Sequence, residues 1–217
     1  MPDFELEDKQ DGIVFGIDEV GRGPLAGPVV AACVHIPQAA RSLSFIKDIK
    51  DSKKISKPKL GKLYELITDH CDWAVAEISV DEIDDINILQ ASLKAMSLSF
   101  QNISKPNKYS KAYHCLVDGN KMPQLPCSAA TVIKGDGKSY SIAAASIVAK
   151  VTRDRIMREL HEEFPHYSWN TNAGYGSKAH LSGIDAHGIT KYHRKSFAPV
   201  RNFIEYGTTR NPSESAV

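Results

Sequence analysis

Short apolar runs alternate with longer stretches of helical spacing along most of this chain. The apolar runs have the length and composition of buried strands and lie at residues 12–18, 28–36, 73–78, 113–117 and 130–133. Apolar residues at helical spacing predict helices at residues 56–70, 81–102, 141–164 and 178–187. Asp81 is the expected cap of the second helix. This order predicts an α/β fold with a mixed sheet of about five strands flanked by helices, followed by a C-terminal helical extension.

The composition changes at Pro165, after which the chain is rich in asparagine, glycine and aromatic residues and loses its clear periodicity. We therefore expect a single α/β core with flanking segments rather than several domains. The expected segments are an N-terminal tail at 1–11, the core at 12–165, a helical substrate-binding extension at 166–207 and a flexible tail at 208–217.

The 217 residues are 42% hydrophobic and 24% charged, with a formal net charge of +1, which is typical of a globular protein. The longest apolar runs are too short to span a bilayer, and the acidic N-terminus lacks the features of a secretory signal. Four scattered cysteines without a Cys-x-x-Cys pair predict reduced thiols and a cytoplasmic protein. Lysines and arginines concentrate at 47–63 and 191–201, which favours a polyanionic partner, although each cluster alone is also typical of a solvated face.

Carboxylates recur where apolar runs end. Asp18 and Asp118 each lie at the end of a predicted strand, just before a turn, Glu19 follows Asp18, and Asp136 lies in a glycine-flanked turn after another apolar run. Any one of these acids could be a turn or capping residue. As a set at one edge of a sheet they favour a site for hard divalent cations, of the kind that activates water for phosphodiester hydrolysis.

The segment Gly21-Arg22-Gly23 follows the first two acids directly. Its glycines let a ligand approach the backbone closely, and its arginine suits a phosphate. The chain has no His-Glu-x-x-His pair, no Gly-x-Ser-x-Gly elbow and no P-loop lysine, which leaves no rival metal or nucleophile motif. The histidines late in the chain lack ligand spacing, and we expect most of them at the surface.

Taken together, these motifs resemble the bacterial ribonuclease HII (type 2 ribonuclease H) family, in the family's order, from about residue 12 to 203. The matching segments are Asp18–Pro24, Asp51–Lys54, Asp118–Asn120, Lys134–Asp136 and Ser141–Asp154. The resemblance implies a ribonuclease H-like fold and hydrolysis of the RNA strand of RNA–DNA hybrids. It also implies incision 5′ of single ribonucleotides in duplex DNA, leaving 3′-hydroxyl and 5′-phosphate ends. The implied cofactor is a pair of Mg²⁺ or Mn²⁺ ions, and the implied enzyme is a monomer.

Carried over to this sequence, the resemblance makes Asp18, Glu19, Asp118 and Asp136 the catalytic acids and metal ligands. Asp136 is preferred to Asp154, which lies well inside a helix among basic residues, where an ion pair explains it better.

The resemblance gives the substrate-reading role to Gly21, Arg22, Gly23 and Tyr175. The glycine–arginine loop would detect the ribose 2′-hydroxyl at an RNA–DNA junction. Tyr175 would stack beneath the junction sugar. Gly176 follows it here, where the family more often has proline.

Supporting contacts to phosphates are expected from basic and hydroxyl residues near the same motifs, each of which could equally be structural. These residues are Lys53, Lys54, Ser146, Lys150, Arg194 and Lys195.

Two other functions fit part of the pattern. A type 3 ribonuclease H would carry a platform domain before the core, and only about eleven residues precede the first strand here. A non-catalytic hybrid-binding module would not need all four acids. The sequence leaves protein partners such as a sliding clamp open.

Overall fold

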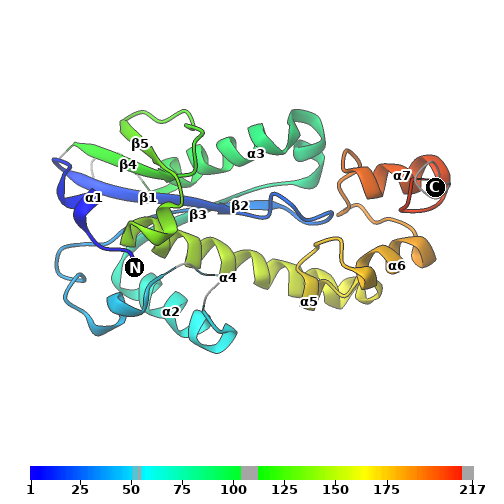
Figure 1. Cartoon of the computed structure of the whole chain (residues 1–217), viewed down its shortest axis with the longest axis horizontal. Helices are drawn as coiled ribbons and strands as arrows, with labels where there is room; N and C mark the ends of the chain where they lie inside the picture. The colour runs from blue at the N-terminus through cyan, green and yellow to red at the C-terminus, as the bar shows by residue number, and fades with distance from the viewer. Residues whose placement is uncertain (51, 53–54, 104–111, 212–217) are drawn as a thin grey trace. The chain divides into compact units, whose positions relative to one another are not determined.

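The computed structural model describes residues 1–50, 52, 55–103 and 112–211 (Figure 1). Its centre is a five-stranded sheet in the order β3-β2-β1-β4-β5. The strands are β1 (Ile13–Val20), β2 (Val29–His35), β3 (Asp72–Ile78), β4 (Tyr113–Asp118) and β5 (Ser128–Val132). β1 is antiparallel to β2 and parallel to β4, which in turn is parallel to β5, so the predicted mixed sheet is confirmed.

The predicted helices are also confirmed, with small shifts at their ends. The helices are α1 (Glu5–Asp8), α2 (Lys57–His70), α3 (Val80–Ile103), α4 (Tyr140–Glu163), α5 (Trp169–Asn172), α6 (Lys178–His187) and α7 (Ala198–Tyr206). Short 3-10 turns are η1 (Ser44–Asp48), η3 (Gly135–Gly137) and η4 (Pro165–Tyr167).

Helix α3 differs from its prediction in two respects. The backbone amide of Glu82, in the first turn of the helix, donates a hydrogen bond to the Ser79 hydroxyl at 3.3 Å. Ser79 is therefore the cap, and the prediction of Asp81 as the cap is wrong. The helix is also broken at Asn87, where φ is 66°. The Asn87 side chain accepts from the amides of Leu89 and Gln90 at 3.0 and 3.2 Å and so caps the second part of the helix.

The chain forms two compact units, each built from three separate segments. The first unit comprises residues 1–20, 30–77 and 92–152, and the second comprises residues 21–29, 78–91 and 153 onward. The unit boundaries fall inside α3 and α4, whereas the sequence pattern suggests one break near residue 165.

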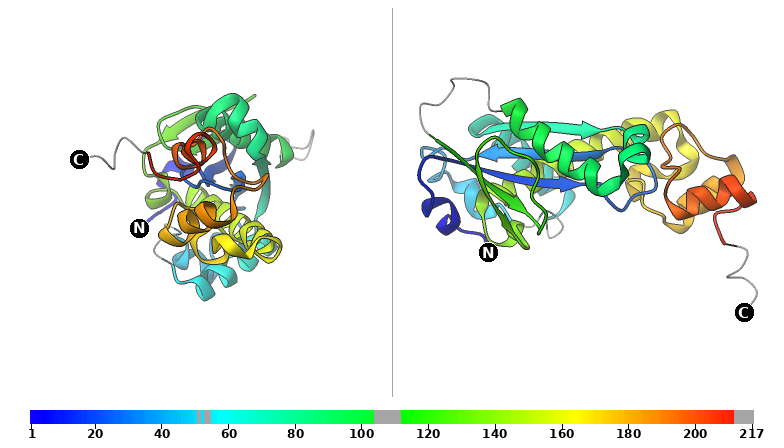
Figure 2. Two further views of the ribbon diagram at one scale, coloured as in Figure 1. Left: turned by 90° about the vertical axis from the view of Figure 1, so that its right-hand side faces the viewer. Right: turned by 90° about the horizontal axis from the view of Figure 1, so that it is seen from above.

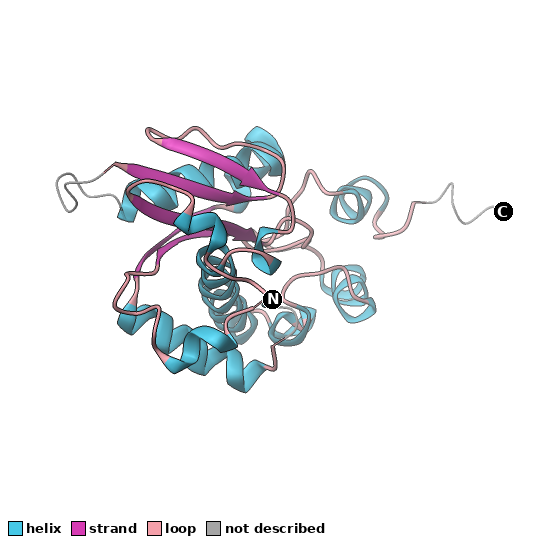
Figure 3. Cartoon of the chain, turned by 60° about the vertical axis from the view of Figure 1, so that its left-hand side comes forward, coloured by secondary structure: helices cyan, strands magenta, loops and turns pink. Residues whose placement is uncertain are grey.

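In the first unit, α2 and the N-terminal half of α4 cover one face of the sheet and the C-terminal half of α3 covers the other (Figure 3). Ala32 and Val34 of β2 pack towards α4, while Phe15 meets Phe100 of α3 edge-on at 5.5 Å. Helix α4 approaches β1 closely because Gly16 has no side chain: a Cβ there would lie 2.1 Å from the carbonyl carbon of Ser141.

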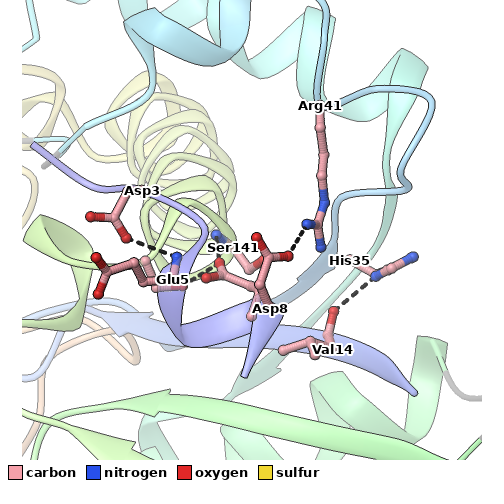
Figure 4. A network of polar contacts seen from close by, with 9 residues as sticks. Asp3, Glu5, Asp8, Val14, His35, Arg41 and Ser141 are labelled. Atoms are coloured by element: carbon pink, nitrogen blue, oxygen red, sulfur yellow. Dashed lines mark hydrogen bonds and ion pairs between the residues drawn. The ribbon is translucent and has the colours of Figure 1, made fainter. Parts of the chain in front are cut away.

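Residues of the predicted N-terminal tail fold against this unit (Figure 4). Asp3 forms a β-bridge with Ser139, and Asp8 pairs with Arg41. The buried Glu7 accepts from the Ser139 hydroxyl at 2.7 Å and from the Ser141 amide at 2.9 Å. A carboxylate therefore caps the first turn of α4, where the helix dipole favours a negative charge.

The second unit has its own apolar core around Trp169, Tyr167 and Met157, and α6 and α7 pack together within it (Figure 2). Thr209, in the predicted C-terminal tail, is buried, and its amide and hydroxyl donate to Asp185 at 2.7 and 3.1 Å. All four cysteines are free thiols, as predicted. In the part of the chain that the structure describes, no helix is long and apolar enough to cross a membrane.

Candidate active site

Two aspartates lie side by side where the pairing of the parallel strands β1 and β4 ends. Ile17 pairs with Val117 in the β1–β4 ladder, and Asp18 and Asp118 are the next residues along the two strands. The two carboxylates interact, because the charge of Asp118 raises the pKa of Asp18. The structure therefore brings together the two acids that the sequence placed at strand ends.

Asp18 lies on the face of β1 that α4 covers, because it is two residues beyond Gly16. This position lets the Ser146 hydroxyl of α4 donate a hydrogen bond to the Asp18 carboxylate. The Oδ1 atom of Asp18 also accepts from the amide of Glu19 at 2.8 Å. The carboxylate is thus oriented by two donors.

Burial raises the pKa of Asp18 well above its ordinary value, and the charges of Glu19 and Asp118 raise it further. The hydrogen bonds from Ser146 and the Glu19 amide act in the opposite direction and lower that pKa. Asp18 is only 7% exposed. A buried carboxylate beside two further acids calls for a compensating cation.

Ser52 extends the support of Asp18. Its Oγ lies 3.0 Å from Oγ of Ser146. Because the single proton of Ser146 goes to Asp18, Ser52 is the donor to Ser146. Ser146, which was predicted to contact phosphate, lies between Ser52 and the Asp18 carboxylate in the structure.

The turn η3 joins Asp136 to this site. The amide of Gly135 donates to Oδ1 of Asp118 at 2.6 Å, and Asp136 is the next residue. A Cβ at Gly135 would lie 2.5 Å from the side chain of Ile142 and 3.1 Å from Asp118 Oδ1, so the turn requires glycine here. The third acid-bearing segment is therefore fixed against the second.

These acids fit a hard divalent cation by their chemistry, since carboxylate oxygens are the ligands that Mg²⁺ and Mn²⁺ prefer. Because Asp18 is buried beside Glu19 and Asp118, its ionised form is unfavourable unless a cation compensates the negative charge. Among the described residues, however, no three His, Cys, Asp or Glu side chains gather closely enough to form a metal site on their own. The protein thus provides part of a shell, which water and phosphate oxygens would complete.

The Gly21-Arg22-Gly23 loop belongs to the second unit. Gly21 is buried with φ of 99°, and a Cβ there would lie 2.3 Å from Nε of Arg153. Arg22 and Gly23 are exposed. A Cβ on Gly23 would lie 3.3 Å from the ring of Tyr175, which is 51% exposed. The structure therefore brings the predicted loop and the predicted tyrosine together.

Arg194 was predicted to contact phosphates of the duplex, and that prediction is wrong for its side chain. Arg194 is 0% exposed, and its guanidinium donates to the carbonyls of Gly21, Arg22 and Gly27. It can therefore act on a substrate only through the loop.

The other predicted phosphate contacts are placed differently. Lys195 is exposed, and its amide donates to Asp84 at 2.8 Å, which leaves its side chain available to a polyanion. Lys150 is half-buried on α4. Lys53 and Lys54 lie outside the described residues.

Sequence reasoning missed several buried polar residues of the second unit. Arg153 is 1% exposed, although its sequence context suggests a surface helix. His180 and His193 are 0% exposed, so the expectation of surface histidines is wrong for these two. They are hydrogen-bonded to each other, and Nε2 of His180 also accepts from the Trp169 indole. The partners of Arg153, and the contact between the two histidines, join positions that are distant in sequence, so no local pattern marks the burial of these residues.

The five-stranded mixed sheet, with carboxylates just beyond the last residues paired between β1 and β4, is a ribonuclease H-like fold. A model of the ribonuclease HII family matches residues 15–200. Ribonuclease HII of Rickettsia conorii is 54% identical over 185 residues, covering 85% of this chain and 91% of its own. That of Wolbachia pipientis subsp. Culex pipiens is 48% identical over 200 residues, covering 92% and 98%. The chain belongs to the ribonuclease HII family, whose members are endonucleases that cleave the RNA of RNA–DNA hybrids.

Solved structures share the fold. Ribonuclease H2 from Pyrococcus horikoshii aligns with a TM-score of 0.72 at 24% identity, covering 90% of this chain and 98% of that chain. A ribonuclease HIII named Bst-RNase HIII, solved in complex with Mn²⁺, aligns with a TM-score of 0.69 at 15% identity, covering 91% and 71%.

Proposed function

We propose that this protein incises DNA duplexes 5′ of single embedded ribonucleotides, in addition to cleaving RNA–DNA hybrids. It would leave 3′-hydroxyl and 5′-phosphate ends and serve ribonucleotide excision repair and RNA primer removal. The observation that carries this proposal is the apposition of Gly23 and the exposed Tyr175 ring in the second unit. A backbone that a ribose can approach, next to an aromatic ring that can stack on the following sugar, suits a junction between RNA and DNA.

Asp18, Glu19, Asp118 and Asp136 would hold the divalent ions, either Mg²⁺ or the Mn²⁺ found with the related ribonuclease HIII. A bound pair of ions supplies an activated water and stabilises the departing 3′-oxygen, and no covalent enzyme intermediate is needed.

The protein's own groups orient these ligands. Ser146, supported by Ser52, directs the Asp18 carboxylate, and the Gly135 amide directs Asp118. Asp18 and Asp118 are therefore held before substrate arrives, so little reorganisation of these two acids is required at the moment of reaction.

Exposed residues of the second unit would recognise the nucleic-acid substrate. Arg22 is exposed beside two glycines, where its guanidinium can pair with a phosphate. Tyr175 presents half of its side-chain surface to solvent, which leaves its ring free to stack on a sugar. Lys195 adds a sequence-independent contact to the backbone of the duplex.

The test compares three labelled duplexes with Mg²⁺: one containing a single ribonucleotide, one continuous RNA–DNA hybrid and one of DNA alone. The proposal expects cleavage of the first two only, with ends that a polymerase can extend and a ligase can join. Tyr175→Ala should lower cleavage of the single-ribonucleotide duplex more than that of the hybrid. Tyr206→Ala, at an equally exposed tyrosine of α7, is the matched control. Cleavage of the hybrid alone by the wild-type protein would contradict the proposal.

A further inference from the structure

Two arginines are buried in the second unit. Arg153 is 1% exposed and Arg194 is 0% exposed. Burial lowers the pKa of Arg153 to about 10, and burial together with the charge of Arg153 lowers that of Arg194 to about 9. Both side chains stay charged at neutral pH. Cations are rarely buried to this degree, because removing them from water is costly unless partners compensate.

The partners of Arg153 are three backbone carbonyls. Its Nε donates to Pro28 at 2.9 Å and its Nη2 to Ala26 at 3.0 Å, both at the C-terminal end of the loop that begins at Gly21. Its Nη1 donates to Ala173 at 2.8 Å, two residues before Tyr175. One planar guanidinium therefore links the glycine–arginine loop to the tyrosine segment.

Direct backbone contacts run along the same link. The amide of Leu25 donates to the carbonyl of Gly174 at 2.8 Å. Gly174 has φ of 82°, and a Cβ there would lie 2.5 Å from the carbonyl oxygen of Ala26. The two segments are thus held at backbone contact distance, with Arg153 between their carbonyls.

Arg194 fixes the loop itself. It donates to the carbonyls of Gly21 at 2.6 Å, Arg22 at 3.1 Å and Gly27 at 2.8 and 3.0 Å. The described residues contain no cis peptide bond, and in a trans peptide the carbonyl and the following amide point in opposite directions. Because two successive carbonyls face the guanidinium, the amides of Arg22 and Gly23 point away from it. The buried cation therefore turns two donors towards the exposed side of the loop.

We propose that Arg153 and Arg194 are positioning residues for specificity. They set the geometry of the junction reader, which consists of the Gly21-Arg22-Gly23 loop and Tyr175, without touching the substrate. Arg194 orients the donors of the loop, and Arg153 fixes the spacing between the loop and Tyr175. This inference rests on the proposed function, since it concerns how a single ribonucleotide is distinguished from continuous RNA.

Lysine is the informative replacement at both positions. It keeps the positive charge and much of the aliphatic stem, but it has a single ammonium in place of a planar fork with five donors. A lysine cannot bond the three dispersed carbonyls of Arg153 in the same geometry. Small displacements of positioning groups reduce rates about ten- to a hundredfold.

The experiment measures kcat/KM on the single-ribonucleotide duplex and on the continuous hybrid for the wild type, Arg153→Lys and Arg194→Lys. We expect each variant to lose at least about tenfold on the first substrate relative to the second. A general loss of folded protein would lower both values equally and leave their ratio unchanged. Arg158→Lys, at an exposed arginine further along α4, is the matched control and should keep the wild-type ratio.

Thermal unfolding establishes which variants fold, and either folded lysine variant decides the question. If a folded variant keeps the wild-type ratio, the positioning role is wrong while the proposed function stands. If the wild type itself cleaves the hybrid but not the single-ribonucleotide duplex, the proposed function fails and this inference fails with it.

Discussion

The Nε2 atom of His193 lies 3.1 Å from the Nε2 atom of His180, and the neighbours of the two rings determine which of these atoms carries a proton. Nδ1 of His193 accepts from the Thr190 amide at 2.9 Å, so its proton is on Nε2. Nε2 of His180 accepts a hydrogen bond from this N–H and a second one from the Trp169 indole at 3.0 Å. Nδ1 of His180 is then the donor to the carbonyl of Tyr175 at 2.9 Å. Two neutral histidines thus form a chain of hydrogen bonds, from His193 to His180 and on to the backbone carbonyl of Tyr175.

This arrangement predicts a loss of stability in mild acid. Burial lowers the pKa of His193 to about 3, with a smaller contribution from His180, while its ordinary value is 6.5. Between these values the unfolded chain binds a proton that the folded chain does not, so stability rises with pH across this window and falls as the pH is lowered through 6.5. Lowering the pH from 7 to 5 should cost about 2 kcal/mol through this group, at roughly 1.4 kcal/mol per pH unit.

Urea unfolding of the wild type and His193→Gln at both pH values measures this effect. Other groups titrate in both proteins, so the informative quantity is the stability difference between them, which should shrink by about 2 kcal/mol on acidification. Ser182→Ala, at an exposed position of α6 without a titratable side chain, should keep a constant difference from the wild type. A constant difference for His193→Gln would show that this histidine does not take up its proton on unfolding.

Gly16→Ala should destabilise the first unit by about 3 kcal/mol or more, because the new Cβ would overlap the backbone of Ser141 and Ile142. The helix would have to move away from β1, carrying Ser146 from Asp18, so activity should fall as well. Gly61→Ala is the control: a Cβ there meets nothing within 4 Å, and alanine in helix α2 should stabilise by about 0.5–1 kcal/mol. Equal effects of the two substitutions on the urea midpoint would contradict the close contact.

Glu7→Ala should destabilise the protein by about 2 kcal/mol, because it leaves the Ser139 hydroxyl and the Ser141 amide without their buried acceptor. The turn that carries Asp136 adjoins this cap, so catalytic activity should decline too. Glu7→Gln keeps an acceptor oxygen and should recover part of both losses. Glu5→Ala, at an exposed position of α1, should change the unfolding free energy by less than about 0.5 kcal/mol.

Asp118→Asn should reduce cleavage by roughly a hundredfold or more while leaving the fold intact. The asparagine oxygen can still accept from the Gly135 amide, and the loss of one negative charge relieves repulsion at Asp18. Its melting temperature should therefore equal or exceed that of the wild type. Asp69→Asn, at an exposed acid of α2, should leave both quantities unchanged.

The strands, helices and acids were predictable because their signals are local. Each strand contains an apolar run of ordinary length, and Asp18 and Asp118 lie at the ends of two such runs, so parallel pairing alone brings them together. The exact bounds of α6, which has a serine cap at Ser177, also follow from nearby residues.

The errors have the opposite origin, since burial of a polar side chain depends on distant partners. Arg194 and Lys195 are adjacent in one basic run, yet the first is buried against carbonyls of a loop more than 160 residues earlier while the second is exposed. His180 and His193 likewise hydrogen-bond to each other, in addition to Tyr175 and Thr190 nearby in the sequence. Composition records that such residues are polar, but only the tertiary fold decides whether they face water.

The most direct test of the account is the position of the nick in a 5′-labelled DNA duplex that contains one ribonucleotide. The account predicts a single nick on the 5′ side of that ribonucleotide by the wild type with Mg²⁺, and none without a divalent ion or with Asp118→Asn. A nick on the 3′ side, a nick of equal rate without the metal, or full activity of Asp118→Asn would contradict it.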